Sequence, residues 1–302
     1  VSFSPDAEYP VINIEKGGHR PIFGADWAED PALPRVTEIH GGSTVNIVPL
    51  ESDAWVEGLA LETILEHCAR ESKKTGVQFG AVEEGGLIHI HALGESAHAA
   101  SPEGGKNAQT ALLALLASLP LAPSAGQKAI CDLSRLFPYG DNHGTALGVD
   151  QEDAISGRLT LVFSKLTFTK TGFEGQYDSR CPICATNENM RAVSEKNLNA
   201  CGFTFRKKPD MYAPHHTPAE SDLCQTLLRT YGDYTGQKGE CVAIGGGTYA
   251  KMLPNVVAFG PLFAGDPVTE HQPDECIDLE RLVQNAQIIA NAIVKLANLP
   301  LE

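Results

Sequence analysis

Apolar and polar residues alternate over residues 158–180 of this 302-residue chain, in the sequence RLTLVFSKLTFTKTGFEGQYDSR. Apolar residues occupy every second position from Leu159 to Phe163. The alternation then shifts and continues from Leu166. A period of two places every second side chain on the same face, which is typical of a strand with one buried face. The stretch therefore predicts two antiparallel strands, the second of which ends at Arg180.

Other parts of the chain show the longer period of helices. In residues 53–74, apolar side chains recur every three or four positions and Gly76 follows, which predicts a helix ended by a glycine. Residues 76–94 predict a hairpin that turns at the sequence EEGG. Further helices are predicted over residues 111–123, 129–140, 187–202, 221–236 and 279–298.

The ends of the chain differ from its middle. Short apolar strands in ECVAIGGG and NVVAFGP alternate with helices near the C-terminus, which predicts an α/β fold with a largely parallel sheet. The middle predicts an α+β fold with antiparallel strands, in two halves. We therefore expect one domain made of residues 1–15 and 206–302, and a second domain, residues 16–205, inserted into it.

The chain is acidic, with a formal net charge of −15. This charge argues against binding to nucleic acid or to an anionic membrane surface, because both need a basic footprint. The longest apolar stretch, ALLALLASLPLAP, is too short to span a bilayer. A small peptide substrate is compatible with both observations.

Eight cysteines are spaced irregularly in a chain that is long enough to build a large core. We interpret them as mostly reduced thiols of a cytoplasmic protein. Cys181 and Cys184 form the one close pair, and a structural zinc site would need a second such pair.

Three consecutive glycines, Gly245, Gly246 and Gly247, follow an apolar strand. Without side chains, their backbone N–H groups can approach an anion such as a carboxylate closely. The same glycines would also suit a tight turn, and both interpretations stay open.

Three polar residues are candidates for contacts with a substrate. His98, in the loop GESAHAASPEGGKNA, can donate a hydrogen bond into a cleft, although a solvated loop histidine is the commoner outcome. Arg180, at the end of a strand, can hold a carboxylate with two hydrogen bonds or lie on the surface. Asn46, in GGSTVNIVP, can face a substrate or be an ordinary polar residue of an edge strand.

Two residues are candidates for metal ligands. His271 follows the strand NVVAFG, and loops at the carboxyl ends of strands are where α/β folds place ligands. Asp6 is an oxygen ligand of the kind that divalent metals accept. The adjacent pair His215 and His216 competes with His271, and none of these residues has a local partner at metal-binding spacing.

These motifs gain meaning as a set. SPDAEYPVINIEKG, GGSTVNIVP, GESAHAASPEGGKNA, GQYDSRCP, AIGGGTYAKMLPNVVAFGPLF and EHQPDE follow one another in this order. Together they resemble the dinuclear-zinc metallopeptidase family of aminoacylases, carboxypeptidases and carnosinases, and above all its PepV-type (Xaa-His) dipeptidases. The resemblance runs from the first residues almost to the last.

The resemblance implies a phosphorylase/hydrolase-like α/β zinc-peptidase catalytic domain, incomplete here, with an inserted α+β lid domain. It implies hydrolysis of dipeptides with a free N-terminus by a water that two divalent metal ions, zinc or manganese, activate. The two halves of the lid are expected to mimic a dimer, so that a monomer can complete its own site.

The resemblance also implies roles for the candidate residues. Asp6 would bind one metal and His271 the other. His98 would stabilise the oxyanion of the tetrahedral intermediate. Asn46, Arg180 and the amides of residues 245–247 would hold the C-terminal carboxylate of the substrate.

Other residues that the resemblance implies are missing from the sequence. These are a His-x-Asp motif, a bridging Asp in a glycine-rich stretch, and a Glu-Glu pair that supplies the general base. The one adjacent pair, Glu83 and Glu84, falls in the predicted hairpin, and we interpret it as part of a turn. We therefore expect a truncated or cleaved chain, or a missing part in another chain, and a fragment that is inactive alone and binds one metal or none.

Two other hypotheses stay open at this stage. The chain could be a non-catalytic binding or regulatory module of the same fold, or part of an N-acyl amino acid deacylase.

Overall fold

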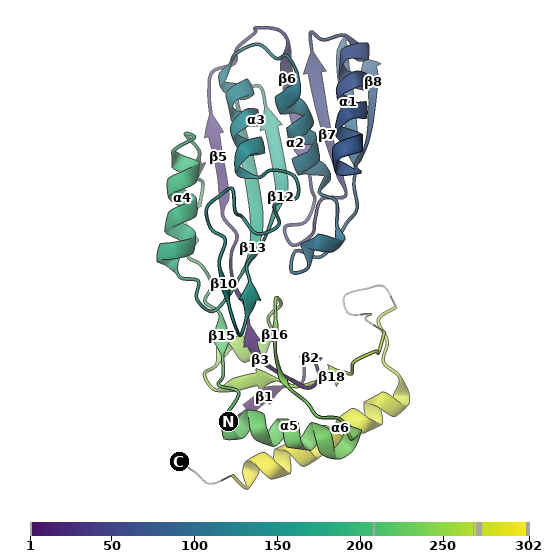
Figure 1. The fold of residues 1–302 in the computed structure, drawn as a ribbon, viewed down its shortest axis with the longest axis vertical. Coiled ribbons are helices and arrows are strands. Elements are labelled where there is room, and N and C mark those ends of the chain that lie inside the picture. Colours follow the sequence, from purple (N-terminus) through teal and green to yellow (C-terminus); the bar gives the residue numbers. More distant parts are fainter. Residues whose placement is uncertain (1, 208, 268, 270–273, 300–302) are drawn as a thin grey trace. The chain divides into compact units, whose positions relative to one another are not determined.

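The computed structural model describes residues 2–207, 209–267, 269 and 274–299. The chain divides into two compact units (Figure 1). Unit 1 contains residues 1–17, 153–157 and 213–302, and unit 2 contains residues 18–152 and 158–212. The expected boundaries after residues 15 and 205, and the assignment of the inserted domain as a lid, stay predictions.

A nine-stranded sheet forms the centre of unit 2. Its hydrogen-bonded order is β14 (Thr204–Phe205), β5 (Ile22–Asp26), β13 (Gly172–Cys181), β12 (Thr160–Thr169), β6 (Arg35–Gly41), β7 (Glu51–Glu57), β9 (Leu87–Leu93) and β8 (Gln78–Glu84), with β4 (Gly17–His19) paired to β13. Neighbours along this order are antiparallel. The strands β12 and β13 are the predicted pair over residues 158–180, and β13 ends one residue after Arg180.

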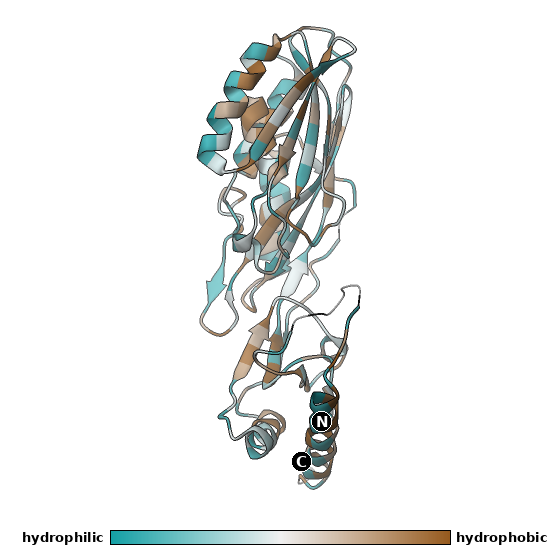
Figure 2. Cartoon of the chain, turned by 90° about the vertical axis from the view of Figure 1, so that its right-hand side faces the viewer, coloured by the Kyte–Doolittle hydropathy of each residue, from teal (hydrophilic) through white to brown (hydrophobic). Residues whose placement is uncertain are grey.

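Helices cover one face of this sheet (Figures 1 and 2). They are α1 (Leu61–Thr75), α2 (Ala108–Ser118) and α3 (Ala125–Leu136). Alternate strand residues such as Ala54, Val56 and Ile90 face the helices and are fully buried in the same core as Leu112 of α2. Helix α2 contacts α1, α3 and the sheet, which explains why it is apolar on nearly all sides.

The prediction of a helix from residue 53 is wrong at its start. Residues Glu51–Glu57 form β7, and the helix begins only at Leu61. Asp53 and Trp55 face away from the helices, while Ser52 and Ala54 face them, so the period in this segment is two and not 3.6. The predicted end is correct, because Gly76 adopts the left-handed conformation (φ 70°) that glycine tolerates best.

Unit 1 contains a five-stranded mixed sheet. Its strands are β1 (Ser2–Ser4), β17 (Val256–Ala258), β3 (Val11–Glu15) and β15 (His215–His216), with β16 (Cys241–Ile244) beside β3. The pairs β1–β17 and β3–β16 are parallel, whereas β17 and β15 are antiparallel to β3. The expectation of a largely parallel sheet therefore holds only in part.

Two helices of unit 1, α5 (Asp222–Thr235) and α6 (Leu279–Ala297), contact each other and match the predicted helices over residues 221–236 and 279–298. Aromatic rings fill the core beside them: the ring of Tyr9 lies 4.8 Å from Phe259 and 4.6 Å from Phe263. None of the helices in the described ranges is long and apolar enough to cross a membrane.

Short elements complete the two units. They are α4 (Ala192–Asn199) after a π-helical turn (Asn187–Arg191), the strands β2 (Ala7–Glu8), β10 (Glu152–Asp153), β11 (Gly157–Arg158) and β18 (Pro261–Leu262), and the 3-10 turns Pro102–Gly104 and Tyr249–Met252. The eight cysteines are all free thiols.

Candidate functional site

Two loops of unit 2 pair with each other and bring Asn46 and His98 together. The backbone N–H of Ala99 donates to the carbonyl of Asn46 at 2.9 Å. Ile47 and His98 lie opposite each other in a short antiparallel bridge. Asn46 and His98, which are 52 positions apart in the sequence, are therefore neighbours in the fold.

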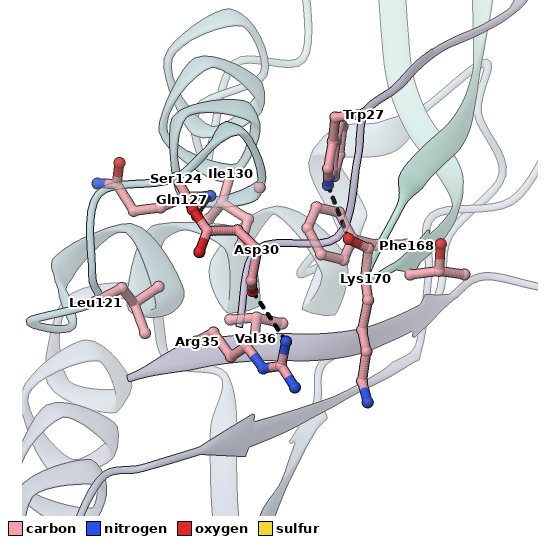
Figure 3. A pocket seen from close by; sticks show the side chains of 12 residues that line it. Trp27, Asp30, Arg35, Val36, Leu121, Ser124, Gln127, Ile130, Phe168 and Lys170 are labelled. Atoms are coloured by element: carbon pink, nitrogen blue, oxygen red, sulfur yellow. Dashed lines mark hydrogen bonds between the residues drawn. The ribbon is translucent and has the colours of Figure 1, made fainter. Parts of the chain in front are cut away.

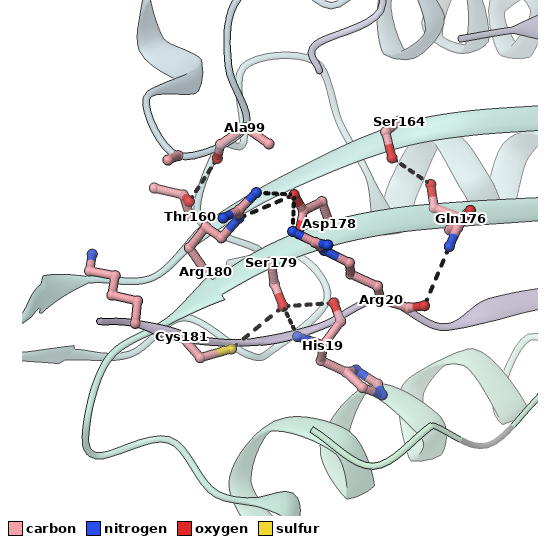
Figure 4. A network of polar contacts seen from close by, with 12 residues as sticks. His19, Arg20, Ala99, Thr160, Ser164, Gln176, Asp178, Ser179, Arg180 and Cys181 are labelled. Carbon is pink, nitrogen blue, oxygen red and sulfur yellow. Dashed lines mark hydrogen bonds and ion pairs between the residues drawn. The ribbon is translucent and has the colours of Figure 1, made fainter. Parts of the chain in front are cut away.

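Arg180 is connected to the same region through Thr160. The hydroxyl of Thr160 donates to the carbonyl of Ala99 at 2.9 Å (Figure 4). Thr160 is the first residue of β12 and lies directly opposite Arg180 on β13. The structure thus gathers Asn46, His98 and Arg180 in one part of unit 2.

Two guanidinium groups share one buried carboxylate in this region (Figure 4). Oδ2 of Asp178 accepts from Nη2 of Arg180 at 2.9 Å and from Nε at 3.2 Å, and Oδ1 accepts from Nε of Arg20 at 2.7 Å. Asp178 is fully buried and Arg180 is 6% exposed. Arg20 and Arg180 thus converge on one carboxylate, and a guanidinium group is the side chain that pairs best with a carboxylate.

Asp178 is a residue that sequence reasoning missed. It lies two positions before Arg180 on the same strand, so both side chains are on the same face. An acidic residue two positions before a candidate arginine on a strand is the signal that could have identified it.

The imidazole of His98 is held in one tautomer when it is neutral. Its Nδ1 accepts a hydrogen bond from the backbone N–H of Ala100 at 3.2 Å. An accepting Nδ1 places the ring proton on Nε2, which is then a donor. His98 is exposed, and a donor in this position can stabilise a negatively charged oxygen.

The glycine loop of unit 1 is held by a second carboxylate that the sequence analysis did not select. Glu15, the last residue of β3, is fully buried. Its Oε2 accepts from the backbone N–H of Thr248 at 2.9 Å, and its Oε1 accepts from the hydroxyl of Thr248 at 2.6 Å. Because Thr248 follows Gly247 directly, these two bonds fix one end of the loop formed by residues 245–247.

The last glycine of this loop has little room for a side chain. A Cβ at Gly247 would lie 2.9 Å from Nζ of Lys251 and 3.4 Å from the carboxylate of Glu15. The strand that leads to Glu15, VINI, is apolar except for Asn13, and this is the sequence signal that could have indicated a buried carboxylate.

The described residues do not form a metal site around the two predicted ligands. Asp6 is exposed, and no hydrogen bond to its carboxylate is found among the residues that the structure describes. His271 lies outside the described residues. Within the described ranges, no three His, Cys, Asp or Glu side chains come together in a way that could hold a metal ion. The residues described here therefore do not by themselves fit the two-metal centre that the resemblance implies.

Further geometry of unit 1 bears on these candidates. Asp6 follows β1 and Gly245 follows β16. Strand β1 is parallel to β17, β17 is antiparallel to β3, and β3 is parallel to β16, so β1 and β16 run in opposite directions.

His215 donates a hydrogen bond from Nε2 to the carbonyl of Val256 at 2.6 Å, so this nitrogen is not a metal ligand.

A hollow elsewhere in unit 2 is too small for a substrate (Figure 3). It lies between Trp27, Arg35 and Lys170, where the indole N–H of Trp27 donates to the carbonyl of Lys170 at 3.0 Å. Its volume of about 20 Å³ has room for about one water molecule.

The chain is similar in sequence to known proteins over nearly its whole length. The chain is 35% identical to a putative dipeptidase, YtjP, of Bacillus subtilis, over 98% of this chain and 64% of that protein. It is 29% identical to the Beta-Ala-Xaa dipeptidase of Lactobacillus delbrueckii subsp. lactis, over 98% of this chain and 62% of that protein. The chain thus spans less than two thirds of the length of these relatives. No family model matches it.

The fold also resembles a solved structure. The crystal structure of the aminoacylhistidine dipeptidase from Vibrio alginolyticus matches 99% of this chain and 65% of that chain, with a TM-score of 0.52 at 15% identity. This match shows a shared mixed α/β fold over part of the length of that protein. By sequence, this partial chain is related to dipeptidases, which are peptide hydrolases, and it shares the fold of one of them over part of that protein's length.

Within that class, the chain belongs to the metallopeptidase family of aminoacylases, carboxypeptidases and carnosinases, in its PepV-like dipeptidase group. The resemblance inferred from the ordered motifs is confirmed at the level of the family. The roles of individual residues, the metals and the substrate stay predictions.

Proposed function

We propose that this chain is the lid and the C-terminal part of a cytoplasmic, metal-dependent dipeptidase that hydrolyses dipeptides with a free N-terminus. Family membership supports the peptidase activity and the need for divalent metal, zinc or manganese. The observation that carries the choice of substrate is the placement of two guanidinium groups, those of Arg20 and Arg180, in the region that also holds Asn46 and His98. A dipeptide has its carboxylate one residue from the scissile bond, so a fixed cation near an oxyanion donor suits it.

In this proposal each residue of unit 2 has one task. Arg180, held in place by Asp178, binds the C-terminal carboxylate, and the amide of Asn46 adds a hydrogen bond. Nε2–H of His98 donates to the carbonyl oxygen of the scissile bond as negative charge develops on it. Because that bond is strongest in the transition state, loss of His98 should lower kcat more than it raises KM.

The glycine loop of unit 1 has a related task in the proposal. The backbone N–H groups of Gly245, Gly246 and Gly247 are further donors to the carboxylate of the substrate. Asp6 and His271 stay the proposed metal ligands. No step is assigned to the metals, because the described residues do not define a site for them.

The test uses the whole protein that contains this chain, with zinc or manganese added. Dipeptides, the same dipeptides with an amidated C-terminus, and N-acetyl amino acids are compared. We expect cleavage of the free dipeptides and at least about tenfold lower kcat/KM for the amides, which lack the charge that Arg180 binds. Cleavage of N-acetyl amino acids alone would favour a deacylase, and no cleavage of any dipeptide would contradict the proposal.

A matched pair of variants tests the role of the arginine. Arg180→Ala should lower kcat/KM about 100-fold for free dipeptides, and much less for the amides, because it removes a charged hydrogen-bonding group from a buried site. Arg70→Ala, on the exposed surface of α1, should change neither. Equal losses of activity for free and amidated dipeptides in Arg180→Ala would show that Arg180 does not bind the carboxylate.

A further inference from the structure

A groove in unit 2 lies beside the loop that carries Asn46. It has a volume of about 460 Å³ and is lined by the end of β6, which contributes the imidazole of His40, by the loop between β6 and β7, by the beginning of β7 and by Ser96. Thr44 and Ile47, on either side of Asn46 in the sequence, both line it. A substrate whose carboxylate meets Asn46 therefore has this groove beside it for its C-terminal side chain.

One part of the groove is apolar. Ile47, Val48, Pro49 and Leu50 contribute to its lining. Ile47 is 37% exposed and Leu50 is 44% exposed, so two large apolar side chains meet water here. A hydrocarbon chain laid along them would remove apolar surface from water, which is favourable.

The other part of the groove is negatively charged. Among the described residues that line it, the charged side chains are Glu51 and Asp53, and neither Lys nor Arg is present. Both are on β7, two positions apart, and so lie on the same face of the strand. A groove that combines an apolar wall with two carboxylates is complementary to an amphipathic cation.

Asp53 is held in position by two imidazoles. Its Oδ1 lies 2.8 Å from Nε2 of His89 and 2.9 Å from Nδ1 of His91. The ring of His89 is in turn stacked on the indole of Trp55, with 4.7 Å between ring centroids and 8° between planes. Both bonds are made to Oδ1, and within the described residues no bond to Oδ2 is found. The carboxylate is thus fixed in advance, with one oxygen available to a ligand.

We infer that this groove binds the cationic side chain of a dipeptide whose C-terminal residue is lysine or arginine. The inference rests on the proposed dipeptidase function and adds a preference to it. The aliphatic part of the side chain packs on Ile47 and Leu50, and the cationic end reaches Glu51 and Asp53. The groove thereby selects the C-terminal residue by charge as well as by length.

The experiment compares three dipeptides with the same N-terminal residue, ending in lysine, norleucine or glutamate, on the whole protein. Norleucine keeps the hydrocarbon chain of lysine and lacks the ammonium group. We expect kcat/KM to fall in the order lysine, norleucine, glutamate, with the lysine peptide about tenfold above the norleucine peptide at low salt. Raising the ionic strength should reduce this ratio, because the groove is open to solvent.

Two variants remove the charges singly. Glu51→Gln and Asp53→Asn should each lower the lysine-to-norleucine ratio about three- to fivefold, mainly through KM, and leave the norleucine peptide unchanged. Glu51 is exposed, so its variant should fold even if the loss of Asp53 disturbs the two imidazoles. Glu84→Gln, exposed at the end of β8 on the same sheet, is the matched control and should leave the ratio unchanged.

The outcomes separate the two proposals. A ratio of one or less in the wild type, or an unchanged ratio in Glu51→Gln, overturns the groove as a cation site, while cleavage of the norleucine peptide still supports a dipeptidase. If none of the three peptides is cleaved, the dipeptidase function itself fails and the inference fails with it.

Discussion

The two regions proposed to bind a carboxylate are built in different ways. In unit 2 the binding group is a charged side chain, Arg180, which Asp178 fixes on a strand inside a nine-stranded sheet. In unit 1 the binding groups are backbone amides of residues 245–247, and the buried Glu15 fixes one end of their loop through Thr248.

Because the binding groups differ, the two regions should respond to different kinds of substitution. A charge acts over several ångströms and is weakened by salt, so the role proposed for Arg180 depends on charge. Backbone amides act only at hydrogen-bonding distance and depend on the exact path of the chain. The unit 2 region should therefore respond most to changes of charge, and the unit 1 region to changes of shape.

The largest effect is expected from removing the carboxylate that two arginines share. Asp178→Ala leaves Arg180 buried and without the partner that accepts two of its hydrogen bonds. We expect the free energy of unfolding to fall by about 3–5 kcal/mol, measured by urea denaturation. Asp233→Asn, which breaks the exposed pair with Lys295, should cost less than about 1 kcal/mol. Similar losses in both variants would show that the shared carboxylate does not hold the region together.

A second test asks whether unit 2 is the acid-sensitive unit. Burial lowers the pKa of His19 to about 4, and its Nδ1 lies 2.9 Å from the hydroxyl of Tyr177. The folded state therefore binds this proton less tightly than the unfolded state, whose histidine keeps its ordinary pKa of about 6.5. Stability from this group is complete above pH 6.5 and is lost as the pH falls to about 4, by on the order of 3 kcal/mol.

The measurement for this test is the free energy of unfolding at pH 7, 5.5 and 4.5, in the wild type and in His19→Gln. The variant lacks the titrating group, so its stability should fall less steeply with acid than that of the wild type. Hydrogen exchange of amides in β13 assigns the effect to unit 2. His40→Gln, at an exposed histidine, is the control and should keep the slope of the wild type. Equal slopes in the wild type and in His19→Gln would contradict a role for His19.

Local patterns predicted the elements that depend on local causes. The pair β12–β13, the glycine-ended helix α1 and the closing helix α6 follow from periodicity and end signals. Strand β7 was not predicted from its sequence, because Trp55 and the apolar residues of the following helix together imitate a helical period. Nothing in the sequence near β16 shows its direction, which is set by its pairing with β3.

The candidate site shows the same limit. Asn46, His98 and Arg180 could be named from motifs, each in its own segment. Their meeting depends on Thr160, whose hydroxyl contacts the chain 61 positions away. Likewise, Glu15 contacts Thr248 across 233 positions, so no local signal connects them. Residues that act by holding another residue are hidden from the sequence because their partners are distant along the chain.

An intermediate effect is expected from releasing the glycine loop of unit 1. Glu15→Ala leaves the N–H and the hydroxyl of Thr248 without their acceptor, and should cost about 2–3 kcal/mol of stability. KM for free dipeptides should rise while kcat changes little, because the loop is proposed to bind the carboxylate and not the reacting carbonyl. Glu15→Gln keeps one acceptor oxygen and should restore part of the affinity. Loss of kcat with unchanged KM would contradict this positioning role.

The smallest change in stability, with a clear functional effect, is expected from Gly247→Ala. The added methyl group meets Nζ of Lys251 at 2.9 Å, and moving this group aside weakens its hydrogen bond to the carbonyl of Lys16, so stability should fall by about 1 kcal/mol. The methyl group also contacts the carboxylate of Glu15, which holds Thr248, so it should shift the proposed amide donors of the loop and raise KM severalfold. Gly80→Ala, at an open position on β8, is the matched control and should alter neither quantity. If Gly247→Ala binds dipeptides as well as the wild type does, then shape in unit 1 is unimportant, and Arg180 with its partners is sufficient for carboxylate binding.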